Sequence, residues 1–80
     1  MRSHVEKILQ AAKAAKKTRG VREDHLNKAV AKALGKRTLT NTEKAAVKHC
    51  LDTLKGERKV KSQFMRKYHF YTWIHSGLFD

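Results

Sequence analysis

The spacing of apolar residues changes near residue 58, and this change constrains the fold more than any other feature of the sequence. Upstream, apolar residues recur every three or four positions in three blocks separated by Gly20, Gly35 and Gly56. Downstream, between about residues 59 and 74, they alternate with polar residues. The first period is typical of amphipathic helices and the second of half-buried strands. The sequence therefore predicts one α+β domain, with three helices followed by a two-stranded β-hairpin.

The predicted helices span about residues 3–17, 23–34 and 41–55, the hairpin spans about 59–74, and a tail covers 75–80. Val21 is expected in a short extended segment between the first two helices. Residues 65–67 form the expected hairpin turn. The apolar stripes of the three helices consist of Val5, Ile8, Leu9, Ala12 and Ala15; Leu26, Ala29, Val30, Ala33 and Leu34; and Val47, Cys50, Leu51 and Leu54.

Polar residues mark where these helices begin and end. Ser3 with Glu6, and Thr40 with Glu43, have the spacing of a capping box, in which each side chain bonds the backbone N–H of the other residue. Gly35 is a typical C-terminal stop. These signals predict well-defined starts for the first and third helices.

The charge balance limits the partners of the protein. Nineteen Lys and Arg residues against seven Asp and Glu residues give a net charge of +12. Forty per cent apolar residues in clear periods favour a folded domain over disorder. The sequence shows no transmembrane or signal-peptide pattern, and the single cysteine excludes an internal disulfide. We expect a cytoplasmic protein with a polyanionic partner, nucleoid-associated if that partner is DNA, and no membrane partner.

The sequence contains no pattern typical of an enzyme, a metal site or a cofactor site. His49 and Cys50 are adjacent, so on a helix their side chains diverge by about 100° and do not form a nucleophile–base pair. The five histidines lack zinc-ligand spacing. Cys50 lies on the apolar stripe, where a small buried thiol is the expected role. We predict no catalytic residues, no metal and no cofactor.

The element order resembles that of the winged helix-turn-helix DNA-binding domains over about residues 4–74. Residues 47–54 look like the third-helix pattern of that family, and residues 56–60 with 68–73 look like its basic, aromatic-rich wing. The resemblance implies that the third helix enters the major groove and that the wing contacts the adjacent backbone or minor groove. It implies a small double-stranded DNA-binding protein, such as a transcription regulator.

Twelve residues are candidates for nucleic-acid contact. The helix face implied by the resemblance carries Asn41, Thr42, Lys44, Lys48 and His49. Asn41 suits adenine and Lys48 suits the acceptors of guanine. Phosphate contacts are expected from Lys36, Arg37, Arg58, Lys59, Lys61, Arg66 and Lys67, because no acid lies near them. If all seven engage a duplex, the log–log salt slope of binding is about −6. The alternative for each residue is an ordinary solvated basic surface.

Aromatic residues concentrate in the predicted hairpin, where five of six lie between Phe64 and Trp73. These aromatics are expected to supply the sheet's part of the core, with Phe70 the first candidate. Tyr71 and Trp73 share the other strand face, so one of the two faces is expected to be partly exposed. An exposed, basic aromatic hairpin suggests a second alternative, RNA binding by stacking of bases on Tyr71 or Trp73.

A further alternative belongs to another class. The basic surface would bind and inhibit an acidic or nucleic-acid-processing protein, by analogy with small phage early products. A homodimer is also considered, because one 80-residue module reads few base pairs. Leu78 and Phe79 in the tail are the candidate dimer patch.

Overall fold

The computed structural model describes residues 1–16 and 20–75, and it shows three helices and a three-stranded antiparallel sheet. The elements follow one another as α1 (Arg2–Ala14), β1 (Val21–Arg22), α2 (Glu23–Ala33), α3 (Asn41–Gly56), β2 (Val60–Met65) and β3 (Tyr68–Trp73). The predicted order of helices and hairpin is confirmed. Lys17, expected in the first helix, lies outside the described residues, as does the tail with Leu78 and Phe79.

The prediction of two strands is wrong, because Val21–Arg22 adds a third. Val21 pairs with Tyr71 and Arg22 pairs with Phe70, so β3 is the central strand in the order β1-β3-β2. A two-residue strand is too short to show alternation, so sequence periodicity reveals only an extended segment there. The third strand closes the free edge of β3 and ties the start of α2 to the base of the hairpin.

The hairpin turns through two residues, Arg66 and Lys67, because Met65 pairs directly with Tyr68. Both turn residues have positive φ angles, 51° and 71°. This is the backbone of a type I′ turn, which matches the twist of the flanking strands and is normally built from Asn and Gly. The turn lies where the sequence places it, with basic residues in unfavoured conformations.

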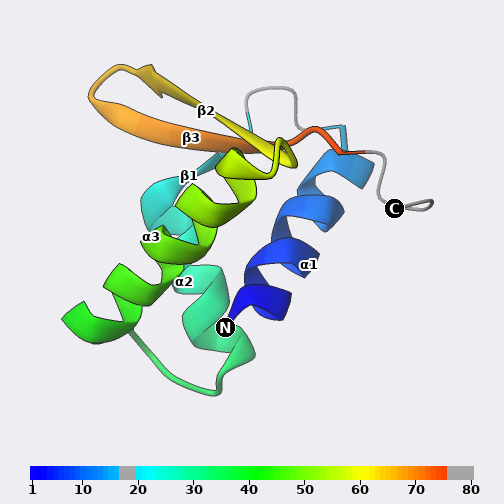
Figure 1. The fold of residues 1–80 in the computed structure, drawn as a ribbon. Coiled ribbons are helices and arrows are strands. Elements are labelled where there is room, and N and C mark those ends of the chain that lie inside the picture. Colours follow the sequence, from blue (N-terminus) through cyan, green and yellow to red (C-terminus); the bar gives the residue numbers. More distant parts are fainter. Residues whose placement is uncertain (17–19, 76–80) are drawn as a thin grey trace.

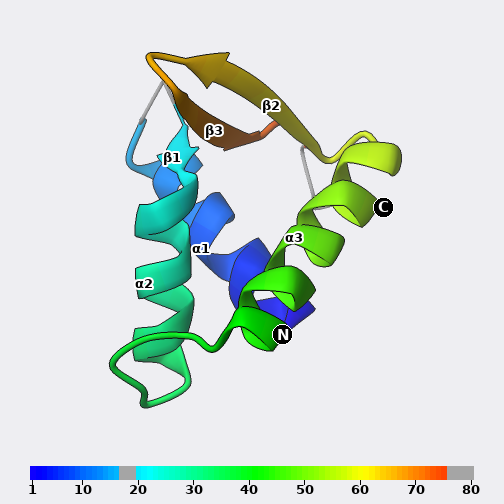
Figure 2. The ribbon, with the colours of Figure 1, turned by 90° about the vertical axis from the view of Figure 1, so that its left-hand side faces the viewer.

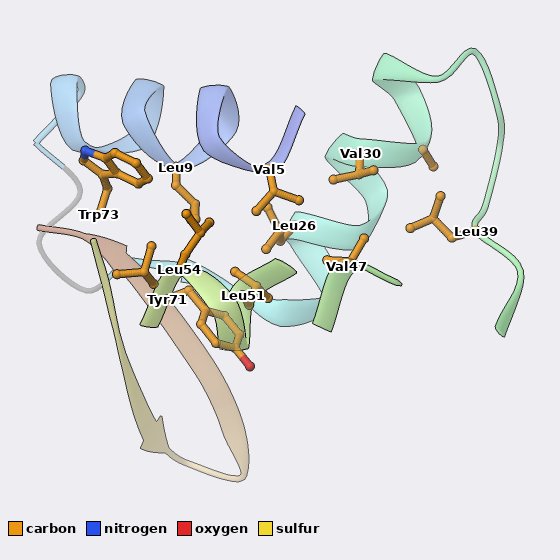
Figure 3. Close-up of a cluster of buried hydrophobic side chains, with 12 residues drawn as sticks. Val5, Leu9, Leu26, Val30, Leu39, Val47, Leu51, Leu54, Tyr71 and Trp73 are labelled. Atoms are coloured by element: carbon orange, nitrogen blue, oxygen red, sulfur yellow. The ribbon is translucent and has the colours of Figure 1, made fainter. Parts of the chain in front are cut away.

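The three helices lie on one face of the sheet (Figure 1). Figure 2 shows the side of the molecule that lies at the left in Figure 1. In this view α2 is on the left, α3 is on the right and α1 lies behind them, while the sheet crosses above the helices. The buried side chains meet between these elements (Figure 3). They are Val5, Leu9, Leu26, Val30, Ala31, Leu39, Val47, Leu51, Leu54, Val60, Tyr71 and Trp73. The predicted stripe of α1 ends sooner than expected, because Ala15 is exposed. In α2, Ala33 is exposed, whereas Leu34 packs against the core.

The strand face that enters the core is opposite to the predicted one. Tyr71 and Trp73 are each only 4% exposed, whereas Phe70 is partly exposed. Alternation along β3 is correct, but it does not say which of two aromatic faces turns toward the helices. The wider rings of Tyr71 and Trp73 are buried between β3 and the helices. Neither ring is therefore available for stacking on RNA bases.

The capping box predicted for the first helix is also wrong. The helix begins at Arg2, Met1 occupies the N-cap position, and no side-chain cap bond forms. The Val5 amide bonds the Met1 carbonyl at 3.3 Å, which places Ser3 inside the first turn. Glu6 lies 3.5 Å from the Arg2 side chain, in an i,i+4 ion pair. Ser3 and Glu6 therefore lie inside the helix and do not form a cap.

Gly35 ends α2 as predicted, through a left-handed residue with φ of 74°. The Gly35 amide bonds the Lys32 carbonyl at 3.1 Å, and the Lys36 amide bonds the Ala31 carbonyl at 2.8 Å. These two bonds form a Schellman motif. The connection to α3 then runs through Leu39, which is buried against the core.

Gly20 provides the sharpest test of the third strand. Its φ is 82°, and a Cβ there would lie 2.5 Å from the Tyr71 carbonyl oxygen. We expect Gly20→Ala to destabilise the domain by about 2–4 kcal/mol through backbone strain and overpacking. Urea denaturation measures the change. Gly56→Ala is the matched control, because a Cβ at Gly56 meets nothing within 4 Å; it should be neutral or stabilise by up to about 1 kcal/mol. Equal stability of wild type and Gly20→Ala would contradict the β1–β3 pairing.

Candidate nucleic-acid interface

The start of α3 is built by the predicted capping box. The Glu43 amide donates to Thr40 Oγ1 at 3.2 Å, and the Thr40 amide donates to Glu43 Oε1 at 2.9 Å. Lys36 Nζ bonds the other Glu43 oxygen, Oε2. The Lys36 ammonium, followed by the Thr40 amide, holds the pKa of Glu43 below its usual value. The helix start is therefore fixed, and the Glu43 charge is balanced by a lysine.

One face of α3 is exposed along its first half. Val47, Leu51 and Leu54 turn the opposite face into the core. The five predicted contact residues on the exposed face, Asn41, Thr42, Lys44, Lys48 and His49, are all solvent-exposed. The helical phase predicted from the sequence is thus confirmed, while the contacts these residues make remain a prediction. Asp52, also exposed, lies one turn beyond Lys48, so the cationic part of this face is its first half.

Two of the predicted phosphate contacts are engaged by acids. Lys36 pairs with Glu43, and Lys59 lies 3.4 Å from Glu57. Glu57 also receives the Arg2 guanidinium at 2.5 Å, and this bond above all lowers the pKa of Glu57. Lys36 and Lys59 therefore present less free charge than the sequence suggests.

The remaining cationic candidates form no ion pair with any acid in residues 1–16 and 20–75. They are Arg37, Lys44, Lys48, Arg58, Lys61, Arg66 and Lys67. Each is solvent-exposed. The described acids that form ion pairs take up Arg2, Arg22, Lys36 and Lys59.

The start of α3 and the hairpin turn border one surface, which runs across the first turns of α2. A shallow cavity of about 160 Å³ is lined by Lys44 together with Asp24 and Asn27. A second cavity, of about 220 Å³, is lined by Lys67 together with the same two α2 residues. Figure 2 looks onto this side of the molecule, which faces away from α1. We call this surface, with Lys44 and Lys67 at its borders, Lys48 one turn beyond Lys44 and Arg66 next to Lys67 in the turn, the basic face.

Other predicted contacts lie away from the basic face. Arg58 and Lys59 follow the end of α3, a helix of 16 residues that is about 24 Å long. Lys61 pairs with Thr72, and alternation puts it on the sheet face that points away from the helices. The seven phosphate candidates therefore do not form a single row.

The structure adds Arg22 and Tyr68 to this region, neither of which the sequence singles out. The Arg22 guanidinium bonds both Asp24 oxygens, at 2.5 and 2.7 Å, and lies 4.3 Å from the centre of the Tyr68 ring. This bidentate pair lowers the pKa of Asp24 to about 2. In the sequence, an arginine two residues before an aspartate at a helix start only weakly indicates such a site. The contact with Tyr68 arises from the β1–β3 pairing, which the sequence does not show. The pair balances the charge of Asp24, one of the two acids that line the cavity beside Lys67; the other is Glu23.

The described residues contain no group of three or more His, Cys, Asp or Glu side chains that could hold a metal ion. Cys50 is partly buried and packs against the core, as its place on the apolar stripe suggested. The Tyr71 hydroxyl lies 3.4 Å from Glu23 Oε2, and burial, aided by the Glu23 charge, raises the pKa of Tyr71 to about 12. Tyr71 is therefore a neutral hydrogen-bond donor inside the domain.

Comparison with protein-family models, with curated proteins and with solved structures finds no significant match to this chain. None of the described helices is long and apolar enough to cross a membrane.

The Arg22–Asp24 pair predicts how acid affects stability. A carboxyl whose pKa is lowered by folding binds protons more weakly when folded, so its stabilisation holds at neutral pH and is lost as pH falls. For Asp24 the loss runs from about pH 4, the unfolded value, down to the folded pKa of about 2. We expect the Tm of Asp24→Asn to lie below wild type at pH 7 and to converge with it near pH 2, measured by circular dichroism. Asp52→Asn is the control, and an Asp24→Asn curve parallel to wild type throughout would contradict the assignment.

Proposed function

We propose that the protein binds double-stranded DNA as a winged-helix domain, with α3 in the major groove and the β2–β3 hairpin on the neighbouring backbone or minor groove. The observation that carries the proposal is the sorting of charge on the surface. Acids pair with Arg2, Arg22, Lys36 and Lys59, whereas Lys44, Lys48, Arg66 and Lys67 form no pair with a described acid. Lys44 and Lys67 border one surface across α2, and Lys48 and Arg66 lie beside them on α3 and in the hairpin turn. Uncompensated cations on one face are the electrostatic footprint of a polyanion site.

The order of elements supports the same proposal. Helix, short strand, two helices and a hairpin follow one another in the order that the winged helix-turn-helix resemblance implies. In this arrangement α3 exposes one face along its first half, and the pairing of β3 with both β1 and β2 braces the base of the hairpin. A B-DNA major groove is wide enough for one helix.

Specific roles follow from the geometry of α3. Asn41 opens the helix and is solvent-exposed, so its amide can pair with an adenine edge. Lys48 lies two turns further along and suits the acceptors of guanine, while Lys44 lies between them and suits phosphate. Asp52 limits the contact to the first half of the helix, because a carboxylate one turn beyond Lys48 repels the backbone.

Backbone strain at the hairpin turn is a further support. Arg66 and Lys67 occupy left-handed conformations that cost about 1–2 kcal/mol per residue for side chains other than glycine. Lys16 and Arg58 are the other described non-glycine residues with positive φ, so all four such positions carry a cation. Strain maintained at a charged, exposed turn is typical of a functional site.

Charge reversal on α3 tests the proposal directly. We expect Lys44→Glu with Lys48→Glu to lower duplex affinity about 10- to 100-fold at 100 mM salt, because two phosphate or base contacts become repulsive. Fluorescence anisotropy with a labelled duplex measures the affinity. Lys7→Glu with Lys13→Glu is the matched control, because these exposed lysines belong to α1, on the far side from the basic face (Figure 1).

The salt dependence of the same titration gives a second readout. Five contacts, from Arg37, Lys44, Lys48, Arg66 and Lys67, predict a log–log slope of about −4 to −5. No duplex binding at 100 mM salt, or equal losses for the α3 and α1 variants, would overturn the proposal. A stoichiometric, nuclease-resistant complex with an acidic protein would then favour the inhibitor alternative.

The hairpin turn offers a test that separates structure from function. Replacing Arg66 with Asn and Lys67 with Gly supplies the residues that a type I′ turn prefers. We expect the variant to be about 1–2 kcal/mol more stable in urea denaturation and to bind duplex DNA more weakly, with a salt slope smaller by about 2. Higher stability with unchanged affinity would mean that the turn does not touch the nucleic acid.

A further inference from the structure

An uncovered apolar ring sits beside the cationic turn of the hairpin. Phe64 is 63% exposed, more than any other large hydrophobic residue in the described part of the chain. Tyr68, next to the turn, is 47% exposed. Leaving a Phe in water forgoes about 1.5–3 kcal/mol of burial. Such a patch marks a contact with a partner when it is combined with specific charge.

The strand register shows which way Phe64 faces. Val60, Tyr71 and Trp73 are the buried residues of the hairpin, and all lie at its base. Phe64 is four residues beyond Val60, so alternation puts it on the same sheet face. That face looks toward the helices at the base of the hairpin, but near the turn nothing among the described residues covers it. Phe64 therefore extends the core-facing side of the sheet beyond the core, on the side where α3 lies.

The ring is held in place rather than free to fold back. Phe64 pairs across the ladder with His69, and the two ring centres are 4.7 Å apart with planes inclined by 59°. Tyr68 is held by the Arg22 guanidinium, 4.3 Å from its ring centre. The tip thus has the Phe64–His69 pair on one sheet face, Tyr68 on the other face and two cations at its apex.

The charge around the hairpin turn indicates which kind of partner the tip contacts. The described part of the chain from Arg58 to His75 contains no acid, and Arg66 and Lys67 are unpaired with any described acid. An apolar protein groove would complement the Phe64 ring but leave these cations without partners. The minor groove of duplex DNA complements both, since it attracts arginine and lysine and contains base steps that an apolar side chain can open.

We propose that Phe64 inserts as a wedge between base pairs of duplex DNA from the minor groove, with Arg66 and Lys67 on the flanking phosphates, and so bends the DNA. The proposal rests on duplex binding as proposed above and adds a mechanical role for one residue. Wedges of this kind kink the helix axis by about 20–90° toward the major groove. Bending toward the major groove would wrap the duplex around α3.

Ring closure of short DNA tests the wedge without a known target sequence. Linear fragments of about 120 base pairs, shorter than the persistence length of about 150, circularise poorly with DNA ligase unless a bound protein bends them. We expect the wild-type protein to promote ring closure, and Phe64→Ala to promote about tenfold less at equal occupancy of the DNA. Phe64→Leu, which keeps an apolar wedge, should retain most of the effect.

Two controls keep the result interpretable. Ile74→Ala removes another exposed apolar residue, 45% exposed at the opposite end of the hairpin, and should leave ring closure unchanged. Circular dichroism confirms folding, which truncation of an exposed ring should preserve. In a duplex carrying 2-aminopurine at TA steps, wild type should raise the fluorescence by unstacking the base, and Phe64→Ala should not.

The outcomes separate the two proposals. No duplex binding by wild type would overturn the proposed function and this inference together. Duplex binding without ring closure, or equal closure by wild type and Phe64→Ala, would overturn the wedge and leave duplex binding intact. If Phe64→Ala lost affinity for a single-stranded thymidine oligonucleotide while ring closure stayed unchanged, the ring would stack on unpaired bases and the wedge would be wrong.

Discussion

Burial of Tyr71 and Trp73 on one face of β3 is the packing interaction on which the domain depends. A chain of 80 residues has a thin core, and these two rings are its largest members. They belong to a buried cluster that includes residues of all three helices, and β3 pairs with strands on both sides. Truncating a ring of this kind typically costs about 3–5 kcal/mol, a large part of the stability of a small domain. The position of the hairpin relative to α3 follows from this packing.

The few acids of the chain determine where its positive charge is free. Glu43 caps α3 and binds Lys36, Glu57 joins Arg2 to Lys59, and Asp24 holds Arg22. Each of these three acids has a basic partner, so the pairs balance charge at the helix ends and at the start of the sheet. On the basic face, the cations at the first half of α3 and at the hairpin turn form no pair with a described acid. The electrostatic asymmetry therefore arises from the same contacts that fix the fold.

The two ends of the hairpin differ in how well they are stabilised. Its base is buried, paired and braced by β1, whereas its tip has two strained cations and an exposed Phe64. Neither the strain nor the exposure benefits the isolated domain, because Asn-Gly and a polar residue would suit a free hairpin better. Their combination at one tip is most simply explained by a contact with a partner, and polyanionic DNA with separable base steps complements both features.

The sequence by itself determined the helices, their order, the Thr40–Glu43 cap, the Gly35 stop and the position of the hairpin turn, because these depend on periodicity and on local hydrogen bonds. It also determined which face of α3 is exposed, since a single apolar stripe leaves only one solution. Tertiary structure decided the remainder. Which aromatic face of β3 is buried and whether Val21–Arg22 forms a strand depend on partners distant in the sequence. Which lysines pair with Glu43 and Glu57 depends on side-chain geometry that periodicity does not reveal, although Lys36 and Lys59 are close to these acids in sequence. Ser3 failed as a cap for a local reason: the helix begins two residues earlier, with Met1 at the N-cap position and its carbonyl accepting the Val5 amide.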